Sequence, residues 1–309
     1  MKDSNPQKFD VGCVADLCID LIMHGNVVPR FHQVEQFVDN YNIELGGSAT
    51  IFTSQFRKLG GKTFIIGAVG EDEFGQVILE RLNAINIDTS AVTIRSDIKT
   101  GLGLALVQDD DRAILTYSGS IDAIKPSDLL NDILTACRHW HIASIFLMKE
   151  LKHHWKNVLQ YCRTNNITTS MDSNWDPEEK WEGLLNLLPM IDVFLLNVAE
   201  AMAITGENTI LKAGKFLSSQ GNIVVIKRGV KGAVAFDKEQ VWQIKSGENS
   251  ANISVVDTIG AGDNFDAGFI RGWQLGWKVQ KCLQLAIRCG TASVTGRGGF
   301  EKQLQEIVE

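Results

Sequence analysis

Short runs of apolar and β-branched residues alternate along the chain with segments in which apolar residues recur every three or four positions. The runs, which predict buried strands, lie at residues 64–69, 192–196 and 223–226. A helix over 151–162 would place on one face Leu151, Trp155, Val158 and Leu159. Since the two patterns alternate over the whole length, we expect an α/β fold with a mostly parallel central sheet and helices on both faces.

Two regions interrupt this alternation. Residues 20–45 are irregular, and residues 100–118 predict a hairpin whose acidic tip, 108–112, has the composition of a turn. We expect the two regions to form a small β-sheet that projects from a single domain spanning residues 1–309. A flap of this kind usually covers a site and excludes water from it, although an acidic tip by itself is typical of any solvated loop.

Charge and cysteine content exclude several classes of protein. The chain has 309 residues, with 30 Lys and Arg against 37 Asp and Glu, a net charge of −7. We expect no nucleic-acid partner, because duplex binding needs a basic stripe. No apolar stretch is long enough to span a membrane, and the first ten residues lack the apolar core of a signal peptide. The six cysteines form no Cys-x-x-Cys pair, so we expect reduced, buried thiols in a cytoplasmic protein.

The stretch richest in chemistry is residues 253–263, where a predicted strand enters a glycine-rich turn, Gly260-Ala261-Gly262, followed by a helix. The helix carries an aromatic residue at every fourth position: Phe265, Phe269, Trp273 and Trp277. A helix N-terminus presents free N–H groups, and glycines let an anion approach the backbone. Asp263 lies in this first turn and could remove a proton from an attacking hydroxyl, although an Asp there could also serve only the helix dipole.

The pattern Asp-Thr-x-Gly-Ala-Gly-Asp over 257–263 resembles the C-terminal signature of the ribokinase-like (PfkB) carbohydrate kinases. Further segments resemble other motifs of that family, in the family's order: 15–20, 46–47, 67–75, 197–206 and 227–232. The resemblance implies a three-layer α/β/α sandwich with a β-lid. It also implies ATP-dependent phosphorylation of an alcohol, usually a sugar CH₂OH, with Asp263 as the base and Gly260, Ala261 and Gly262 as the anion hole.

The resemblance implies a set of cofactor residues. Asn197 and Glu200 would hold Mg²⁺ and phosphate, largely through water, which suits an ion that keeps its hydration shell. The ATP-binding residues would include Asn197, Lys227, Gly229 and Gly232, and a K⁺ site would include Asp257 and Ile259, with the backbone near 295–299. Each has a plainer alternative: Asn197 as a turn residue, Glu200 as a solvated helix charge and Lys227 as an exposed lysine at a strand end.

The acceptor residues come from the same resemblance. The family's first strand ends in a substrate-binding Asp, which places Asp20 at the acceptor, with Asp16 either sharing that role or capping the strand. The remaining acceptor candidates are Gly46, Gly47 and Asn174.

The chain departs from the family pattern at two positions. Ile51 stands where the family usually has an Asn, so Ser48 or Thr50 would have to substitute, or the acceptor lacks a polar group there. Asp176 stands where several relatives carry Arg, and a carboxylate would repel an acidic acceptor. We therefore expect a neutral sugar or a nucleoside rather than a sugar acid.

Three functions remain open at this point: a sugar kinase, a nucleoside kinase of the same superfamily, and a non-catalytic sugar sensor on a kinase fold. Aromatic residues on the flap would favour the nucleoside, and the candidates are Phe31, Phe37 and Tyr41. The intact Asp263 and its glycine turn argue against the sensor. A homodimer through the lid is a further expectation.

Overall fold

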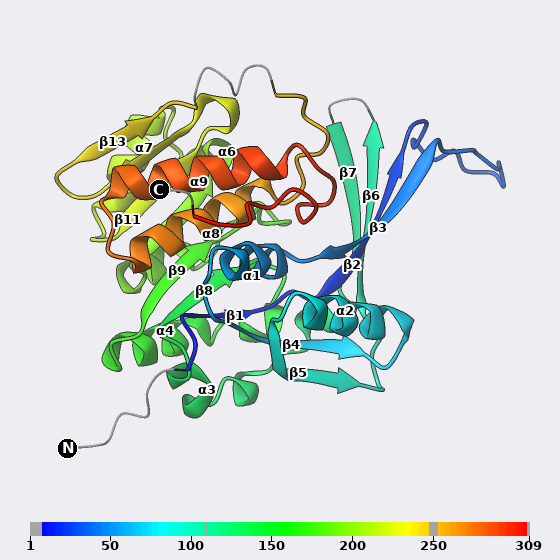
Figure 1. Ribbon diagram of the computed structural model, residues 1–309, viewed down its shortest axis with the longest axis horizontal. Helices are drawn as coiled ribbons and strands as arrows, with labels where there is room; N and C mark the ends of the chain where they lie inside the picture. Colours follow the sequence, from blue (N-terminus) through cyan, green and yellow to red (C-terminus); the bar gives the residue numbers. More distant parts are fainter. Residues whose placement is uncertain (1–7, 109–110, 247–252, 308–309) are drawn as a thin grey trace.

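The structure is a computed structural model that describes residues 8–108, 111–246 and 253–307. The strands of its main sheet are β1 (Val11–Val14), β4 (Thr63–Gly70), β5 (Asp88–Arg95), β8 (His139–Ala143), β9 (Thr168–Asp172), β10 (Val193–Asn197), β11 (Ile223–Lys227), β12 (Ala233–Phe236) and β13 (Val241–Ile244). Their order is β13-β12-β11-β10-β9-β8-β1-β4-β5 (Figure 1). The strands from β11 to β5 are parallel and β12 and β13 run antiparallel, so the predicted mostly parallel sheet is confirmed.

Helices cover both faces of the main sheet: α1 (Ser48–Lys58), α2 (Glu73–Ala84), α3 (Asn131–Thr135), α4 (Trp155–Thr164), α5 (Leu184–Leu187), α6 (Val198–Thr205), α7 (Ile210–Ser218), α8 (Ala261–Gln274) and α9 (Val279–Ser293). Successive strand residues enter opposite cores, as Ile65 and Ile66 of β4 do. The core on one face is closed by α1, α2, α8 and α9, and the core on the other by α3 to α7. The chain is therefore a three-layer α/β/α sandwich.

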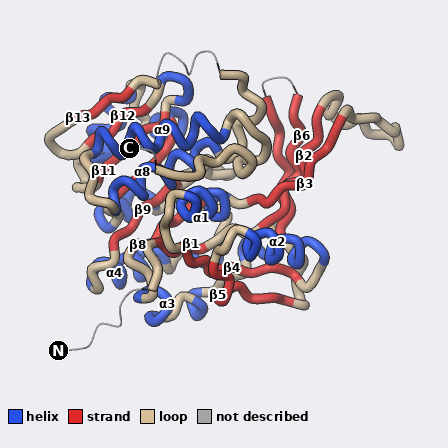
Figure 2. Tube along the Cα trace, in the orientation of Figure 1, coloured by secondary structure: helices blue, strands red, loops and turns tan. Residues whose placement is uncertain are grey.

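The small sheet consists of β2 (Cys18–His24), β3 (Asn40–Gly46), β6 (Gly101–Gln108) and β7 (Asp111–Tyr117), in the order β3-β2-β6-β7. The predicted hairpin is present as antiparallel β6 and β7, although its tip at 109–110 lies outside the described residues. The irregular region 20–45 supplies most of β2 and β3, which pair with each other, while β2 pairs in parallel with β6. Figure 2 shows these strands projecting beyond the helical layers.

Three local expectations were wrong, two at the end of a helix and one in the presence of a strand. The helix expected from Leu151 begins only at Trp155, after a turn of 3₁₀ helix. Trp277 lies beyond α8, which ends at Gln274 ahead of Gly276, a residue with φ +73°. The strand expected to enter the glycine turn does not form over residues 253–258, because Val255 and Val256 are exposed and their segment pairs with the end of α9 rather than with a strand.

The six cysteines are free and buried, in agreement with the sequence. Within the described residues, no helix is both long and apolar enough to cross a bilayer.

Candidate active site

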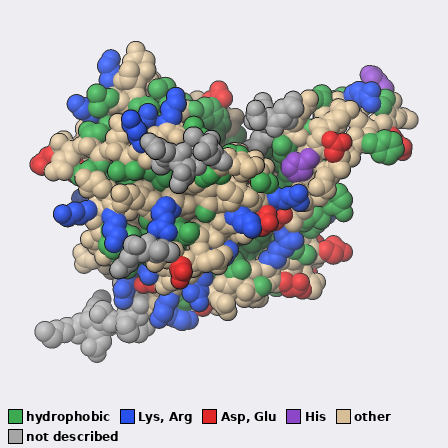
Figure 3. All heavy atoms as spheres, turned by 45° about the horizontal axis from the view of Figure 1, so that its top comes forward, with side chains coloured by type: hydrophobic (Ala, Val, Ile, Leu, Met, Phe, Trp, Pro, Cys, Tyr) green, Lys and Arg blue, Asp and Glu red, His purple; other side chains and the backbone are tan. Residues whose placement is uncertain are grey.

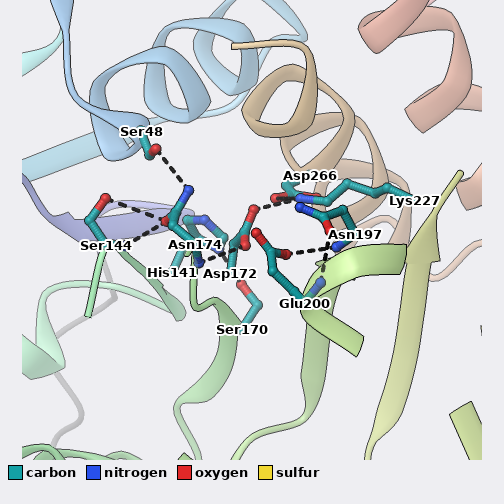
Figure 4. Close-up of polar contacts among 10 residues, drawn as sticks. All are labelled: Ser48, His141, Ser144, Ser170, Asp172, Asn174, Asn197, Glu200, Lys227 and Asp266. Carbon is teal, nitrogen blue, oxygen red and sulfur yellow. Dashed lines mark hydrogen bonds and ion pairs between the residues drawn. The ribbon is translucent and has the colours of Figure 1, made fainter. Parts of the chain in front are cut away.

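Polar residues follow one strand after another at the carboxyl edge of the main sheet. They are Asp16 after β1, Ser144 after β8, Asp172 at the end of β9, Asn197 at the end of β10 and Lys227 at the end of β11. Ligands of parallel α/β sheets bind outside this edge, because the strand ends there bring chemistry from distant segments together. Figure 4 shows most of these side chains converging.

Asp16 fixes the start of α1. Its Oδ2 accepts hydrogen bonds from the Ser48 amide at 3.1 Å and the Ser144 hydroxyl at 2.6 Å, and its Oδ1 accepts from the Ala49 amide at 3.1 Å. The carboxyl is buried, which raises its pKa, and the hydrogen bonds to the charged form oppose that shift. Gly47, with φ +90°, lies directly against the Asp16 carbonyl, where a side chain would clash.

Asn174 extends this network. Its Oδ1 accepts from the Ser144 amide at 2.7 Å, and its Nδ2 donates to the Ser48 hydroxyl at 3.1 Å. Ser144 and Asn174 both have positive φ, +52° and +53°, a conformation that costs free energy in residues other than glycine. Strain of this kind persists where a surrounding structure imposes it, and it concentrates at functional sites. We call Asp16, Ser48, Ser144 and Asn174 the acceptor network, after the role that the family resemblance implies for Asp16 and Asn174.

Asp20 does not end the first strand of the main sheet, as the sequence suggested. Residues 15–20 are not one strand, because β1 ends at Val14 and the chain crosses into the small sheet before β2 begins at Cys18. Asp16 is therefore the carboxylate that follows the first strand of the main sheet, and Asp20 belongs to β2. A Cβ added to Gly46 on the neighbouring strand would lie 2.7 Å from the Asp20 carboxyl carbon, so this glycine makes room for Asp20.

The first turn of α8 has the geometry of an anion site. Gly260 begins the turn with φ +70°, and the Asn264 amide makes the first regular helical bond, to the Gly260 carbonyl at 2.9 Å. The Ala261 amide lies 3.3 Å from the Thr258 carbonyl. The N–H groups of Gly262 and Asp263 lie in the part of the turn where a helix offers no carbonyl partner.

Asp263 is buried at 9% exposure, with several charges around it. Burial raises its pKa to about 8. The Asp172 and Asp16 carboxylates act in the same direction, whereas the Lys227 ammonium and a hydrogen bond from Ser48 lower the pKa. A carboxyl with such a pKa can change its protonation state near neutral pH, as a general base requires.

We expect a carboxyl group of the unliganded protein to titrate near pH 8, followed by ¹³C NMR, and to be missing in Asp263→Asn. Because the folded-state pKa exceeds the unfolded value, the native state binds the extra proton between these values, and the free energy of unfolding falls as pH rises through that window. Chemical denaturation at pH 5 and pH 8 should show a smaller difference in Asp263→Asn than in the wild type. Equal differences in the two proteins would contradict this titration.

Lys227 is neither exposed nor free to meet a phosphate in this structure. Its side chain is 12% exposed, and its Nζ lies 2.5 Å from Asp172 Oδ2 and 2.9 Å from Asp266 Oδ2. Neither carboxylate was singled out from the sequence. Their signals were weak: Asp172 ends a short strand, Thr168–Asp172, whose one apolar residue is Met171, and Asp266 stands one helical turn after Asp263.

Asn197 and Glu200 form a reciprocal cap at the start of α6. Glu200 N–H donates to Asn197 Oδ1 at 2.9 Å, and Asn197 N–H donates to Glu200 Oε2 at 2.8 Å. Burial raises the pKa of Glu200 to about 7, with a further contribution from the Asp172 charge. Glu200 is therefore not a solvated helix charge. These oxygen donors are of the kind that Mg²⁺ accepts, directly or through water.

The remaining turns are held by backbone geometry. Gly229 and Gly232 both have positive φ, +55° and +84°, in the turn after β11. Asp257 ties two loops together, because its Oδ1 accepts from the Ile259 amide at 2.8 Å and its Oδ2 from the Gly298 amide at 2.9 Å.

The two departures from the family pattern have structural explanations. Ile51 is 3% exposed and packs against Gly260 and Gly299, so it supports the glycine turn instead of facing an acceptor. Asp176 accepts backbone hydrogen bonds from Glu178, Lys180 and Trp181 at 2.7 to 2.9 Å. Its carboxylate therefore stabilises a turn, which weakens the argument that it repels acidic acceptors.

A helix N-terminus with free N–H groups, beside a buried carboxylate and a polar network, is the kind of arrangement that an enzyme needs to transfer a phosphoryl group to a hydroxyl. The family model for pfkB family carbohydrate kinases matches residues 9–305, and the chain belongs to this family. It is thus a phosphotransferase, and its fold is ribokinase-like.

Curated relatives include 5-dehydro-2-deoxygluconokinase of Geobacillus thermodenitrificans (strain NG80-2), 28% identical over 89% of this chain and 84% of that protein. Ribokinase of Lactococcus lactis subsp. lactis (strain IL1403) is 24% identical over 96% and 95%. Among solved structures, a protein described as a ribokinase II from E. coli, in complex with ATP and Mg²⁺, has a TM-score of 0.82 at 23% identity and covers 96% of both chains.

Proposed function

We propose that this protein is an ATP-dependent kinase that phosphorylates a hydroxyl, a CH₂OH group, of a neutral sugar. The observation that carries the proposal is the position of Asp263, buried in the first turn of α8 and hydrogen-bonded to Ser48 of the acceptor network. Asp263 would act as the general base. The Gly260–Gly262 turn would stabilise the negative charge of the transferring group through backbone N–H groups and the helix dipole.

The acceptor would lie between the main sheet and the small sheet. The sugar hydroxyls would be bound by the side chains of Asp16, Asn174 and Asp20 and by the backbone of Gly46 and Gly47. The ATP site would be formed by Gly229, Gly232 and Asn197, with Glu200 and Asn197 holding Mg²⁺ through water; Lys227, which the family resemblance also assigns to ATP, is held by Asp172 and Asp266. The metal would neutralise phosphate charge when bound. We propose that the small sheet is a lid that excludes water during transfer.

A sugar acid is the second candidate acceptor, because the Asp176 carboxylate is engaged by backbone amides and the relative from Geobacillus thermodenitrificans is named for a gluconate. A pocket of about 1050 Å³ adjoins Asp176 and includes Lys149, Lys152 and Lys180 in its lining. The neutral sugar is the first candidate acceptor, because the carboxylates of Asp16 and Asp20 would repel an acidic one.

The function is tested by coupled ADP release with MgATP and a panel of aldoses, ketoses, sugar acids and nucleosides. We expect ADP release that depends on a neutral sugar. Turnover confined to the acids or the nucleosides would replace the acceptor assignment, and excess EDTA provides the metal-free control. Absence of ADP release with every acceptor, from folded protein that binds a sugar, would favour the sensor.

We expect K⁺ to raise the phosphorylation rate several-fold relative to tetramethylammonium at equal ionic strength. The motivation is the Asp257–Ile259 turn, which hydrogen-bonds to the segment at 295–299 and adjoins the anion hole. Initial rates in the two salts check this. Li⁺, which is smaller than K⁺, provides a second control beside the large tetramethylammonium ion. Equal rates in all three salts would contradict a monovalent-cation site.

We also propose that the lid mediates a homodimer in the cytoplasm. Large apolar side chains are exposed on it, including Phe31 at 82%, Phe37 at 91% and Tyr41 at 61%. Figure 3 shows hydrophobic side chains on the projecting part of the molecule. Sedimentation of the wild type and of Phe37→Ser/Tyr41→Ser tests this association.

A further inference from the structure

Lys227, at the end of β11, is fixed on two sides by buried carboxylates. Its Nζ donates to Asp172 Oδ2 at 2.5 Å and to both oxygens of Asp266, at 2.9 and 3.2 Å. The side chains of Asp172 and Asp266 are 4% and 0% exposed. Burial opposes a charge on Lys227, but its two carboxylate partners raise its pKa above the ordinary value, so the ammonium stays charged.

This ammonium lies beneath the first turn of α8. A Cβ built on Gly262 would approach its Nζ to 3.3 Å, so the glycine lets the lysine reach the turn. Asp266 stands three residues after Asp263, which places the two on the same side of the helix. The contact between Lys227 and Asp266 therefore anchors the turn that carries Asp263.

A second set of contacts leads from Lys227 to Asp263 through the acceptor network. Asp172 Oδ1 accepts a hydrogen bond from the backbone N–H of Asn174 at 3.1 Å, and the side-chain Nδ2 of Asn174 donates to Ser48 Oγ at 3.1 Å (Figure 4). Ser48 in turn hydrogen-bonds to Asp263. Lys227 thus lies where two paths meet, one through α8 and one through Asp172.

The charges that face Asp263 come from three elements. Asp172 on β9 and Asp16 after β1 disfavour its ionised form, and Lys227 on β11 favours it. Among these groups, the ammonium is the one that offsets the two carboxylates.

We propose that Lys227 is a positioning residue for Asp263, holding the first turn of α8 against the acceptor network and balancing its charge, rather than a ligand of the nucleotide phosphates. This inference rests on the proposed function, in which Asp263 is the general base. It modifies the assignment of Lys227 to the ATP site, because the ammonium would have to leave two buried carboxylates to reach a phosphate.

The test is Lys227→Met, which keeps the length of the side chain and removes its charge. We expect kcat to fall by about 10²-fold, as a small misplacement of a catalytic group does. The acidic limb of the plot of kcat against pH should move to higher pH, because the ammonium that lowers the pKa of Asp263 is gone. The Kd for MgATP should stay unchanged. Lys215→Met, on the exposed side of α7, is the matched control and should change none of these quantities.

A double variant keeps the test valid if Lys227→Met fails to fold. Lys227→Met/Asp172→Asn removes one positive and one negative charge. It therefore removes one group that lowers the pKa of Asp263 and one group that raises it. We expect its acidic limb to return toward the wild-type position while kcat stays low, because the anchor is still missing. A folded Lys227 variant with wild-type kcat and pH profile would overturn the proposal. A tenfold or larger rise in the Kd for MgATP, with no shift in the acidic limb of the kcat profile, would also overturn it, because it would indicate that Lys227 binds a phosphate.

Failure of the proposed function can be recognised separately. If the wild type releases no ADP with any acceptor, the kinase assignment fails, and Lys227 is then tested in the unliganded protein. The carboxyl resonance of Asp263, assigned by its loss in Asp263→Asn, should titrate at higher pH in Lys227→Met than in the wild type. An unchanged titration would overturn the inference without reference to turnover.

Discussion

Replacement of Asp263 by asparagine is expected to lower kcat by about 10²–10⁴-fold, the usual contribution of a general base. Asparagine keeps the size of the side chain but cannot accept the proton of the acceptor hydroxyl. The Kd for MgATP should change little or decrease slightly, because a negative charge near the phosphates is removed. Folding should survive, since the loss of a favourable helix-dipole charge costs about 0.3–1 kcal/mol and the carboxyl is costly to bury.

Asp132→Asn is the matched control for this experiment. Asp132 also lies in the first turn of a helix, α3, but it is exposed and is not a site residue. Steady-state kinetics and thermal unfolding of both variants separate catalysis from stability. Near-normal turnover by folded Asp263→Asn would contradict the mechanism and reopen a non-catalytic role for the site.

Gly260→Val is expected to lower kcat by about 10²–10³-fold, the loss that follows removal of one preorganised donor. Gly260 has φ +70°, which a β-branched residue adopts only with strain. A Cβ there would lie 2.8 Å from Ile51 Cδ1 and 3.1 Å from Gly299 Cα. The turn must therefore move, and its N–H groups would no longer point at the transferring group.

Gly206→Val separates backbone strain from this local clash. Gly206 has the same φ of 70° and ψ of 5° at the end of α6, and a Cβ there would meet no atom within 4 Å. We expect Gly206→Val to lose about 1–2 kcal/mol of stability with an unchanged kcat. If the two variants showed equal kinetic losses, the effect at Gly260 could not be assigned to the anion turn.

Sequence patterns determined the layers of this fold because the signals are local. The β4 segment is apolar at almost every position, as a strand buried on both faces must be, and the helical segments repeat their apolar residues every three or four positions. The glycine turn ahead of Asp263 was equally readable, since a positive φ, a close approach and a helix start each leave a mark in a few adjacent residues. Motifs of this kind predict an anion site without any knowledge of the neighbouring strands.

The partners of those residues were decided by the tertiary structure. Lys227 meets Asp172 and Asp266, which stand 55 and 39 residues away, and no local pattern distinguishes a paired lysine from an exposed one. The positions of Asp16 and Asp20 depended on where β1 ends and β2 begins, a boundary that alternating apolar residues do not mark. Ile51 supports the glycine turn because α1 packs beside α8. The sequence by itself therefore determined the layers and the glycine turn ahead of Asp263, whereas only the packing of distant segments decided which charges surround Asp263.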